Sequence, residues 1–146
     1  MKIVSWNEYS EILKKVYEDI RFRQFDNIIA IGRGGSIIGA YLASKLGIPT
    51  FQPIFLRHVN TRGIKGIEDT APAMRDQINS LMGKLLIVDD YLREGLAMKH
   101  VLDLISEKTS AQTLVMYDRK GSEFKPDIVG AYIEDTEISF PYYVFG

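Results

Sequence analysis

The sequence contains no cysteine, so disulfide bonds and thiolate chemistry are excluded. It also lacks an excess of charge of either sign, since 18 Lys and Arg residues face 19 Asp and Glu residues and leave a net charge of −1. A nucleic acid is therefore not an expected partner. No apolar run is long enough for a signal peptide or a membrane span, and we expect a cytoplasmic protein without membrane contact.

The composition is that of a globular protein, with 46% apolar and 25% charged residues. The 146 residues fit one domain, which we expect to span 1–146. Ser5 and Glu8 form a capping box, and apolar residues follow at helical spacing as far as Ile20. This pattern predicts a first amphipathic helix.

Short apolar runs then alternate with helical patterns, as in a parallel α/β sheet. The patterns predict strands at 27–31, 51–56, 85–88 and 113–117, and helices at 36–46 and 96–105. Residues 58–80 lack clear periodicity and exceed an ordinary connection, which indicates either a functional flap or a poorly ordered segment. The tail at 127–145 is aromatic and β-prone.

A glycine-rich turn, Ile31-Gly-Arg-Gly-Gly-Ser36, joins the first buried strand to a helix. Glycines let backbone N–H groups approach an anion, and the helix that follows adds its positive end. Arg33 could pair with a phosphate through two hydrogen bonds. Many such turns only connect a strand to a helix, so the motif alone leaves both interpretations open.

Two adjacent carboxylates, Asp89 and Asp90, follow the apolar run at 85–88, and a helix is expected shortly afterwards. Loop amides and a helix N-terminus beyond a strand of a parallel sheet favour anions. Carboxylates at such a place could hold sugar hydroxyls directly or through Mg²⁺. An isolated pair of this kind is more often a solvated pair that opens a loop.

Both motifs resemble those of a known family. Residues 28–39 resemble the pyrophosphate-binding loop of xanthine-guanine phosphoribosyltransferases, and residues 84–99 resemble the phosphoribosyl-pyrophosphate (PRPP) motif of type I phosphoribosyltransferases. The resemblance implies the type I fold, which is a parallel α/β sheet with helices on both faces and a small hood from the chain ends. It also implies a cis peptide in the first loop, and Mg²⁺ as the cofactor.

The resemblance assigns roles to both motifs. Arg33, Gly34 and Gly35 would hold pyrophosphate. Asp89 and Asp90 would hold the ribose and the metal.

The loop after the carboxylate pair departs from the family's pattern. Gly95 matches, but Arg93, Glu94 and Ala97 stand where the family has Asp, Thr and Thr. Arg93 thus takes the place of an acid near the reacting carbon, and these residues with Leu96 would surround the 5′-phosphate. The Glu94 carboxylate would occupy or repel the anion site, whereas Arg93 could partly restore affinity. Turnover and loss of turnover are both left open.

The C-terminal part resembles the purine-recognition end of the same family. Lys120 lies near the position of a lysine that contacts the purine. Glu137 stands where a stacking aromatic residue is expected, and Ile138 holds the next position. A surface cation and an acidic turn before a closing strand are the alternatives. Arg62 and Lys65 would contact pyrophosphate if the flap closes.

Three functions are consistent with these residues. The first is transfer of the phosphoribosyl group of PRPP to a purine base with Mg²⁺. The second is a nucleotide-binding or regulatory protein without turnover. The third is a partner-binding module, which exposed Phe140, Tyr142 and Tyr143 would indicate. The expected ligand is a small molecule, namely PRPP, a purine base or a nucleotide, and a homo-oligomer is left open.

Overall fold

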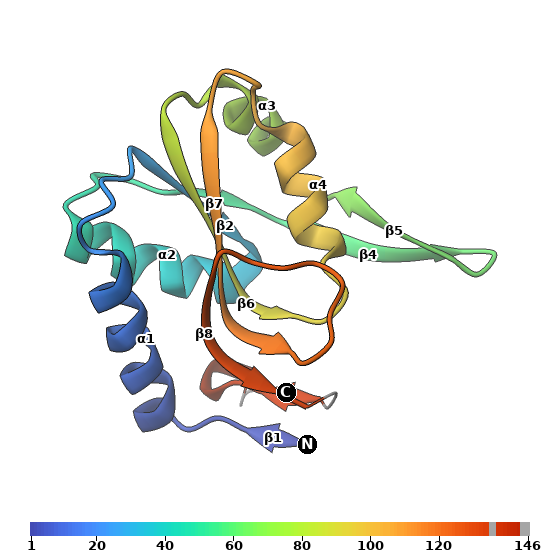
Figure 1. Cartoon of the computed structure of the whole chain (residues 1–146). Coiled ribbons are helices and arrows are strands. Elements are labelled where there is room, and N and C mark those ends of the chain that lie inside the picture. Colours follow the sequence, from blue (N-terminus) through green and yellow to red (C-terminus); the bar gives the residue numbers. More distant parts are fainter. Residues whose placement is uncertain (135–136, 144–146) are drawn as a thin grey trace.

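The computed structural model describes residues 1–134 and 137–143. Its centre is a five-stranded parallel sheet with the order β3-β2-β6-β7-β8 (Figure 1). The strands span Gln52–Ile54 (β3), Asn27–Ile31 (β2), Lys84–Leu92 (β6), Ser110–Arg119 (β7) and Ile128–Ile133 (β8). The predicted parallel α/β sheet is confirmed.

Helices cover both faces of this sheet (Figure 1). Helices α1 (Trp6–Ile20) and α2 (Gly32–Leu46) pack on one face, and α3 (Pro72–Ser80) and α4 (Leu96–Leu104) pack on the other. No helix in the described part of the chain is long and apolar enough to cross a membrane.

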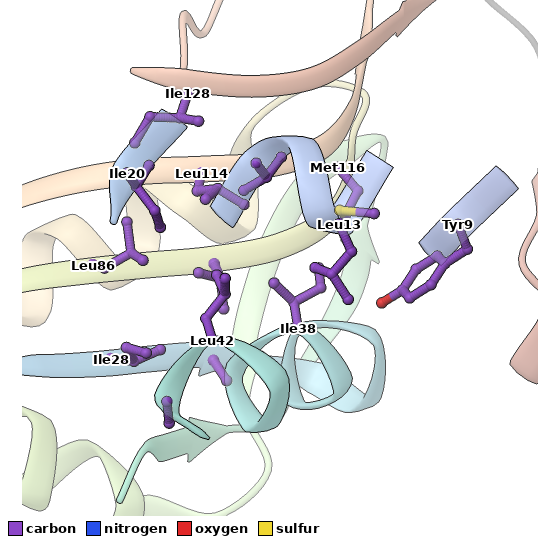
Figure 2. Packing of buried hydrophobic residues seen from close by; sticks show 14 of the residues in the cluster. Tyr9, Leu13, Ile20, Ile28, Ile38, Leu42, Leu86, Leu114, Met116 and Ile128 are labelled. Atoms are coloured by element: carbon purple, nitrogen blue, oxygen red, sulfur yellow. The ribbon is translucent and has the colours of Figure 1, made fainter. Parts of the chain in front are cut away.

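The alternation of side chains along buried strands explains this two-sided packing. In β2, Ile28 and Ala30 face α1 and α2, whereas Ile29 and Ile31 face the other pair of helices. Figure 2 shows the first of these two clusters, in which side chains of α1 and α2 meet those of the sheet. The expected cap of α1 is present, because the Ser5 hydroxyl accepts a hydrogen bond of 3.1 Å from the Glu8 N–H.

The two ends of the chain meet in a second, small sheet, which is the expected hood (Figure 1). Strand β1 (Lys2–Ile3) pairs in parallel with β9 (Ile138–Ser139), and a 3₁₀ turn at Pro141–Tyr143 follows. Phe140 is only 1% exposed, whereas Tyr143 is 50% exposed. Phe140 thus lacks the exposure that would indicate a partner-binding module. Phe145, also part of the aromatic tail, lies outside the described residues.

The segment 58–80, whose sequence lacks clear periodicity, contains regular structure. Strands β4 (Leu56–Thr61) and β5 (Ile64–Asp69) form an antiparallel hairpin, and α3 follows. Arg62 and Gly63 form its two-residue turn with φ angles of 53° and 81°, which suit the right-handed twist of the strands. The strands are mostly exposed or half-buried on both faces, so they lack the alternation that marks a strand in a sequence.

Two other boundaries differ from expectation. Helix α2 begins at Gly32 rather than Ser36, so the glycine-rich motif forms its first turn, and no described peptide bond is cis. Strand β6 continues past Val88 because β7 continues beside it, and Asp89 pairs with Val115 in register. The two carboxylates thus lie within a strand and not after it.

Candidate functional site

One cleft of about 780 Å³ opens where β2 and β6 end and where α2 and α4 begin, and hairpin β4–β5 forms one of its walls. This edge is where ligands of open α/β sheets bind. Most of the predicted phosphate-binding and ribose-binding residues line it: Arg33, Gly34, Lys65, Asp89, Asp90, Arg93, Glu94, Gly95, Leu96 and Ala97.

The other predicted site residues do not line this cleft. Gly35 is buried, and a Cβ at this position would lie only 2.8 Å from the Val88 carbonyl oxygen. Arg62 lies at the tip of the hairpin.

The three residues predicted to bind the base also lie outside the cleft. Lys120 pairs with Glu134 at 2.9 Å, and Ile138 pairs in register with Lys2 in the small sheet. Glu137 precedes that strand, and its carbonyl accepts a hydrogen bond of 2.8 Å from the Lys2 N–H. The predicted base-binding residues are therefore not brought together with the others.

The first turn of α2 presents a cation and backbone amides to the cleft. Arg33 is exposed and forms no ion pair with a described residue. No side chain caps the start of α2, which leaves the N–H groups of its first turn for another acceptor. An exposed guanidinium beside a helix N-terminus suits a phosphate or pyrophosphate group.

The paired carboxylates differ in their surroundings. Asp89 accepts a hydrogen bond of 2.8 Å from the Asp90 N–H, and burial together with the negative charge of Asp90 raises the pKa of Asp89 well above its usual value. Asp90 is only 8% exposed, and its Oδ2 accepts hydrogen bonds from Tyr142 at 2.8 Å and from Tyr143 at 3.1 Å. Asp90 thus has two fixed hydroxyl donors.

The sequence gives no sign of these two tyrosine contacts. Burial, reinforced by the negative charge of Asp90, raises the pKa of both phenols, so they stay protonated and donate. Tyr142 lies 52 residues from Asp90 along the chain. No local pattern in the sequence marks a contact over this separation.

The loop before α4 is connected to the hairpin through a charged pair. Lys65 Nζ lies 2.7 Å from Glu94 Oε1, and this lysine lowers the pKa of Glu94. The Glu94 carboxylate is therefore directed at the hairpin. Arg119 Nε donates a hydrogen bond of 2.9 Å to the Arg93 carbonyl and fixes the loop from below.

A second contact anchors the base of the hairpin. The Asp69 carboxylate at the end of β5 lies 3.1 Å from His100 of α4 and 3.6 Å from Arg75 of α3. The hairpin is therefore joined to α4 through Asp69 and to the loop before α4 through Lys65, and the Lys65–Glu94 pair borders the cleft.

The carboxylates fit a metal ion that is shared with a substrate. Among the described residues, no three His, Cys, Asp or Glu side chains are grouped so that they could hold a metal by themselves. Mg²⁺ is commonly bound through one or two carboxylates together with water and substrate phosphates. Asp89 and Asp90 supply that number of carboxylates at the cleft.

Comparison with known proteins agrees with this geometry. Residues 5–142 match the family model described as phosphoribosyl transferase domain. No curated protein sequence matches the chain.

Three solved structures share the fold. Purine phosphoribosyltransferase from Pyrococcus horikoshii has a TM-score of 0.83 and 22% identity, with 99% of this chain and 95% of that chain covered. A hypothetical protein from Neisseria gonorrhoeae, with ppGpp bound, has a TM-score of 0.77 and 20% identity, with 99% and 90% covered. Xanthine-guanine-hypoxanthine phosphoribosyltransferase from Helicobacter pylori has a TM-score of 0.79 and 13% identity, with 98% and 92% covered.

Proposed function

This chain belongs to the phosphoribosyl transferase domain family, and we propose that it transfers the phosphoribosyl group of PRPP to a purine base and releases pyrophosphate. The proposal rests on one observation, which is that the start of α2, the carboxylate pair of β6 and the loop before α4 line the same cleft. The three parts match the three chemical groups of PRPP, namely a pyrophosphate, a ribose and a 5′-phosphate.

Each part has a role in the proposed reaction. Arg33 and the amides at the start of α2 hold the pyrophosphate and stabilise the negative charge that develops on it. Asp89 and Asp90 orient the ribose through its hydroxyls, and Arg93 with the N-terminus of α4 holds the 5′-phosphate. The bond from the anomeric carbon to pyrophosphate breaks with its electron pair on the leaving oxygen. A ring nitrogen of the base forms the new bond and releases its proton to solvent.

Mg²⁺ would be held by Asp89 and Asp90, and when bound it neutralises charge on the pyrophosphate. The protein's own contribution is mostly positioning. Holding the two reactants in one orientation lowers the entropic part of the barrier, and fixed donors around the leaving group lower its electrostatic part.

The experiment is an incubation of the protein with PRPP, Mg²⁺ and, separately, adenine, guanine, hypoxanthine and xanthine. Chromatography should detect one nucleoside monophosphate and an equal amount of pyrophosphate for at least one base. The Asp89→Asn and Asp90→Asn double variant is the matched control, because it keeps side-chain size and removes both charges. If this variant formed product at the same rate as the wild type, the roles assigned to Asp89 and Asp90 would be disproved.

A second candidate is a protein that binds a phosphorylated nucleotide without turnover. The Lys65–Glu94 pair favours it, because a carboxylate beside the expected 5′-phosphate position opposes PRPP and holds the hairpin lysine. The similar fold from Neisseria gonorrhoeae that was solved with ppGpp shows that such a nucleotide occurs on this fold. Saturable binding of ppGpp or GMP in calorimetry, with no product from any base, would favour this candidate.

A further inference from the structure

The C-terminal turn supplies two hydroxyl groups to Asp90, and we propose that Tyr142 and Tyr143 are positioning residues that fix this carboxylate for ribose recognition. The inference rests on the proposed function, because it assigns Asp90 to the ribose. It adds that the chain end completes the sugar subsite without touching the sugar.

One oxygen of Asp90 is enclosed on three sides. Tyr142 and Tyr143 donate to Oδ2 at 2.8 Å and 3.1 Å. The first turn of α2 lies against the same oxygen, because a Cβ on Gly34 would overlap it. Asp90 lines the cleft together with Gly34 and Tyr143. The two tyrosines and the helix turn therefore fix one oxygen of a carboxylate that borders the cleft.

The position of the Tyr142 hydroxyl is set by the packed aromatic cluster around it. The Tyr142 ring is stacked on Phe140 with the centroids 5.3 Å apart and the planes at 4°. Tyr9 meets the same ring edge-on at 5.7 Å. Phe140 and Tyr9 are 1% and 2% exposed, so the support is part of the core. A donor held this firmly restricts the Asp90 carboxylate to one rotamer.

Tyr143 connects Asp90 to the phosphate end of the cleft. Its ring lines the cleft, is half exposed, and packs edge-on against Tyr142 at 5.1 Å. Arg33, in the first turn of α2, lines the same cleft. The turn therefore holds Asp90 in a fixed place relative to Arg33, and the proposed reaction needs the ribose and the pyrophosphate in a fixed relation.

The experiment compares GMP, which carries a ribose, with inorganic pyrophosphate, which does not, by calorimetry without metal. Tyr142→Phe keeps the ring and removes one donor, and Tyr142→Phe with Tyr143→Phe removes both. We expect GMP to bind about threefold more weakly to the single variant and about tenfold more weakly to the double variant, which corresponds to ~1.4 kcal/mol. The affinity for pyrophosphate should change less than twofold in both.

Tyr117→Phe is the matched control. The Tyr117 hydroxyl donates to Glu8 at 2.8 Å, and its ring packs on Phe140 at 5.8 Å. The control thus removes a hydroxyl–carboxylate bond from the same cluster without touching Asp90, and its GMP affinity should equal that of the wild type.

The following results would overturn the inference. Unchanged GMP affinity in the double variant would show that the hydroxyls do not matter, and tighter GMP binding would show that they compete with the sugar. An equal loss of affinity for GMP and pyrophosphate in the double variant would show a general structural effect. An equal loss of GMP affinity in the Tyr117→Phe control would show the same. If the wild-type protein binds neither GMP nor pyrophosphate, the proposed function fails and the inference fails with it. If the wild type binds both, the variants test the inference alone.

Discussion

Replacing Gly34 with alanine tests how tightly the cleft is built around Asp90. The added Cβ would overlap Oδ2 of Asp90 and lie 3.0 Å from its Cβ. A free carboxylate could rotate away cheaply, but this one accepts hydrogen bonds from Tyr142 and Tyr143. Movement must therefore strain the packing, at about 1–3 kcal/mol, or break bonds to a charged group, at about 1.5–3 kcal/mol each.

Alanine also gains up to about 1 kcal/mol over glycine in a helix, which offsets part of this penalty. We therefore expect Gly34→Ala to lower the free energy of unfolding by about 2–4 kcal/mol. For a chain of this size the melting temperature should fall by roughly 5–15 °C. Urea denaturation followed by circular dichroism measures the change.

A double-mutant cycle with Asp90→Ala identifies the cause. In the Asp90→Ala background most of the overlap is gone, so Gly34→Ala should destabilise by at least about 1 kcal/mol less than in the wild type. Stability within about 0.5 kcal/mol of the wild type for the single Gly34→Ala variant would refute the reasoning, because surface substitutions without strain fall in that range.

Three further predictions concern the charged residues of the cleft. Arg33→Ala should weaken the binding of inorganic pyrophosphate at least tenfold in calorimetry, since a bond between charged groups contributes about 1.5–3 kcal/mol, and unchanged affinity would remove this residue from the site. Asp89→Asn should raise the melting temperature at pH 7, because burial and the adjacent carboxylate raise the pKa of Asp89 and so disfavour its ionised form. The gain should disappear below about pH 4, where the carboxyl is protonated in both the folded and the unfolded state, and a gain independent of pH would contradict this cause. Glu94→Thr with Ala97→Thr should tighten GMP binding about tenfold, because it removes a negative charge, adds two hydroxyl donors and frees Lys65 from its pair, and weaker binding would show that Glu94 supports the native site.

Local patterns predicted the elements that frame the cleft. The Ser5–Glu8 box and the apolar spacing behind it are sufficient for α1, and the short apolar run at 27–31 bounded by glycine is sufficient for β2. Both patterns involve residues that are close in the sequence, so they can be recognised without knowledge of the tertiary structure. The resemblance to the family predicts that Arg33 and Asp89 share one site, and both residues line the cleft.

The remaining features depend on contacts between distant residues. The hairpin turn at Arg62–Gly63 was missed because its strands carry few buried side chains, so their periodicity is weak. The length of β6 depends on β7, which continues beside it.

The predicted base-binding residues show that a family's functional residues cannot always be assigned to this chain position by position. Lys120 forms a pair with Glu134 instead of lining the cleft. The acidic turn that follows Glu134 includes residues 135–136, which lie outside the described part of the chain.

A crystal structure with PRPP and Mg²⁺ would show whether one cleft binds PRPP in one orientation. We expect pyrophosphate density beside Arg33 and the first turn of α2, ribose hydroxyls at Asp89 and Asp90, and the 5′-phosphate at residues 93–97. Density for PRPP elsewhere on the surface, or in the cleft with its two phosphate ends exchanged, would show that the proposed binding mode is wrong.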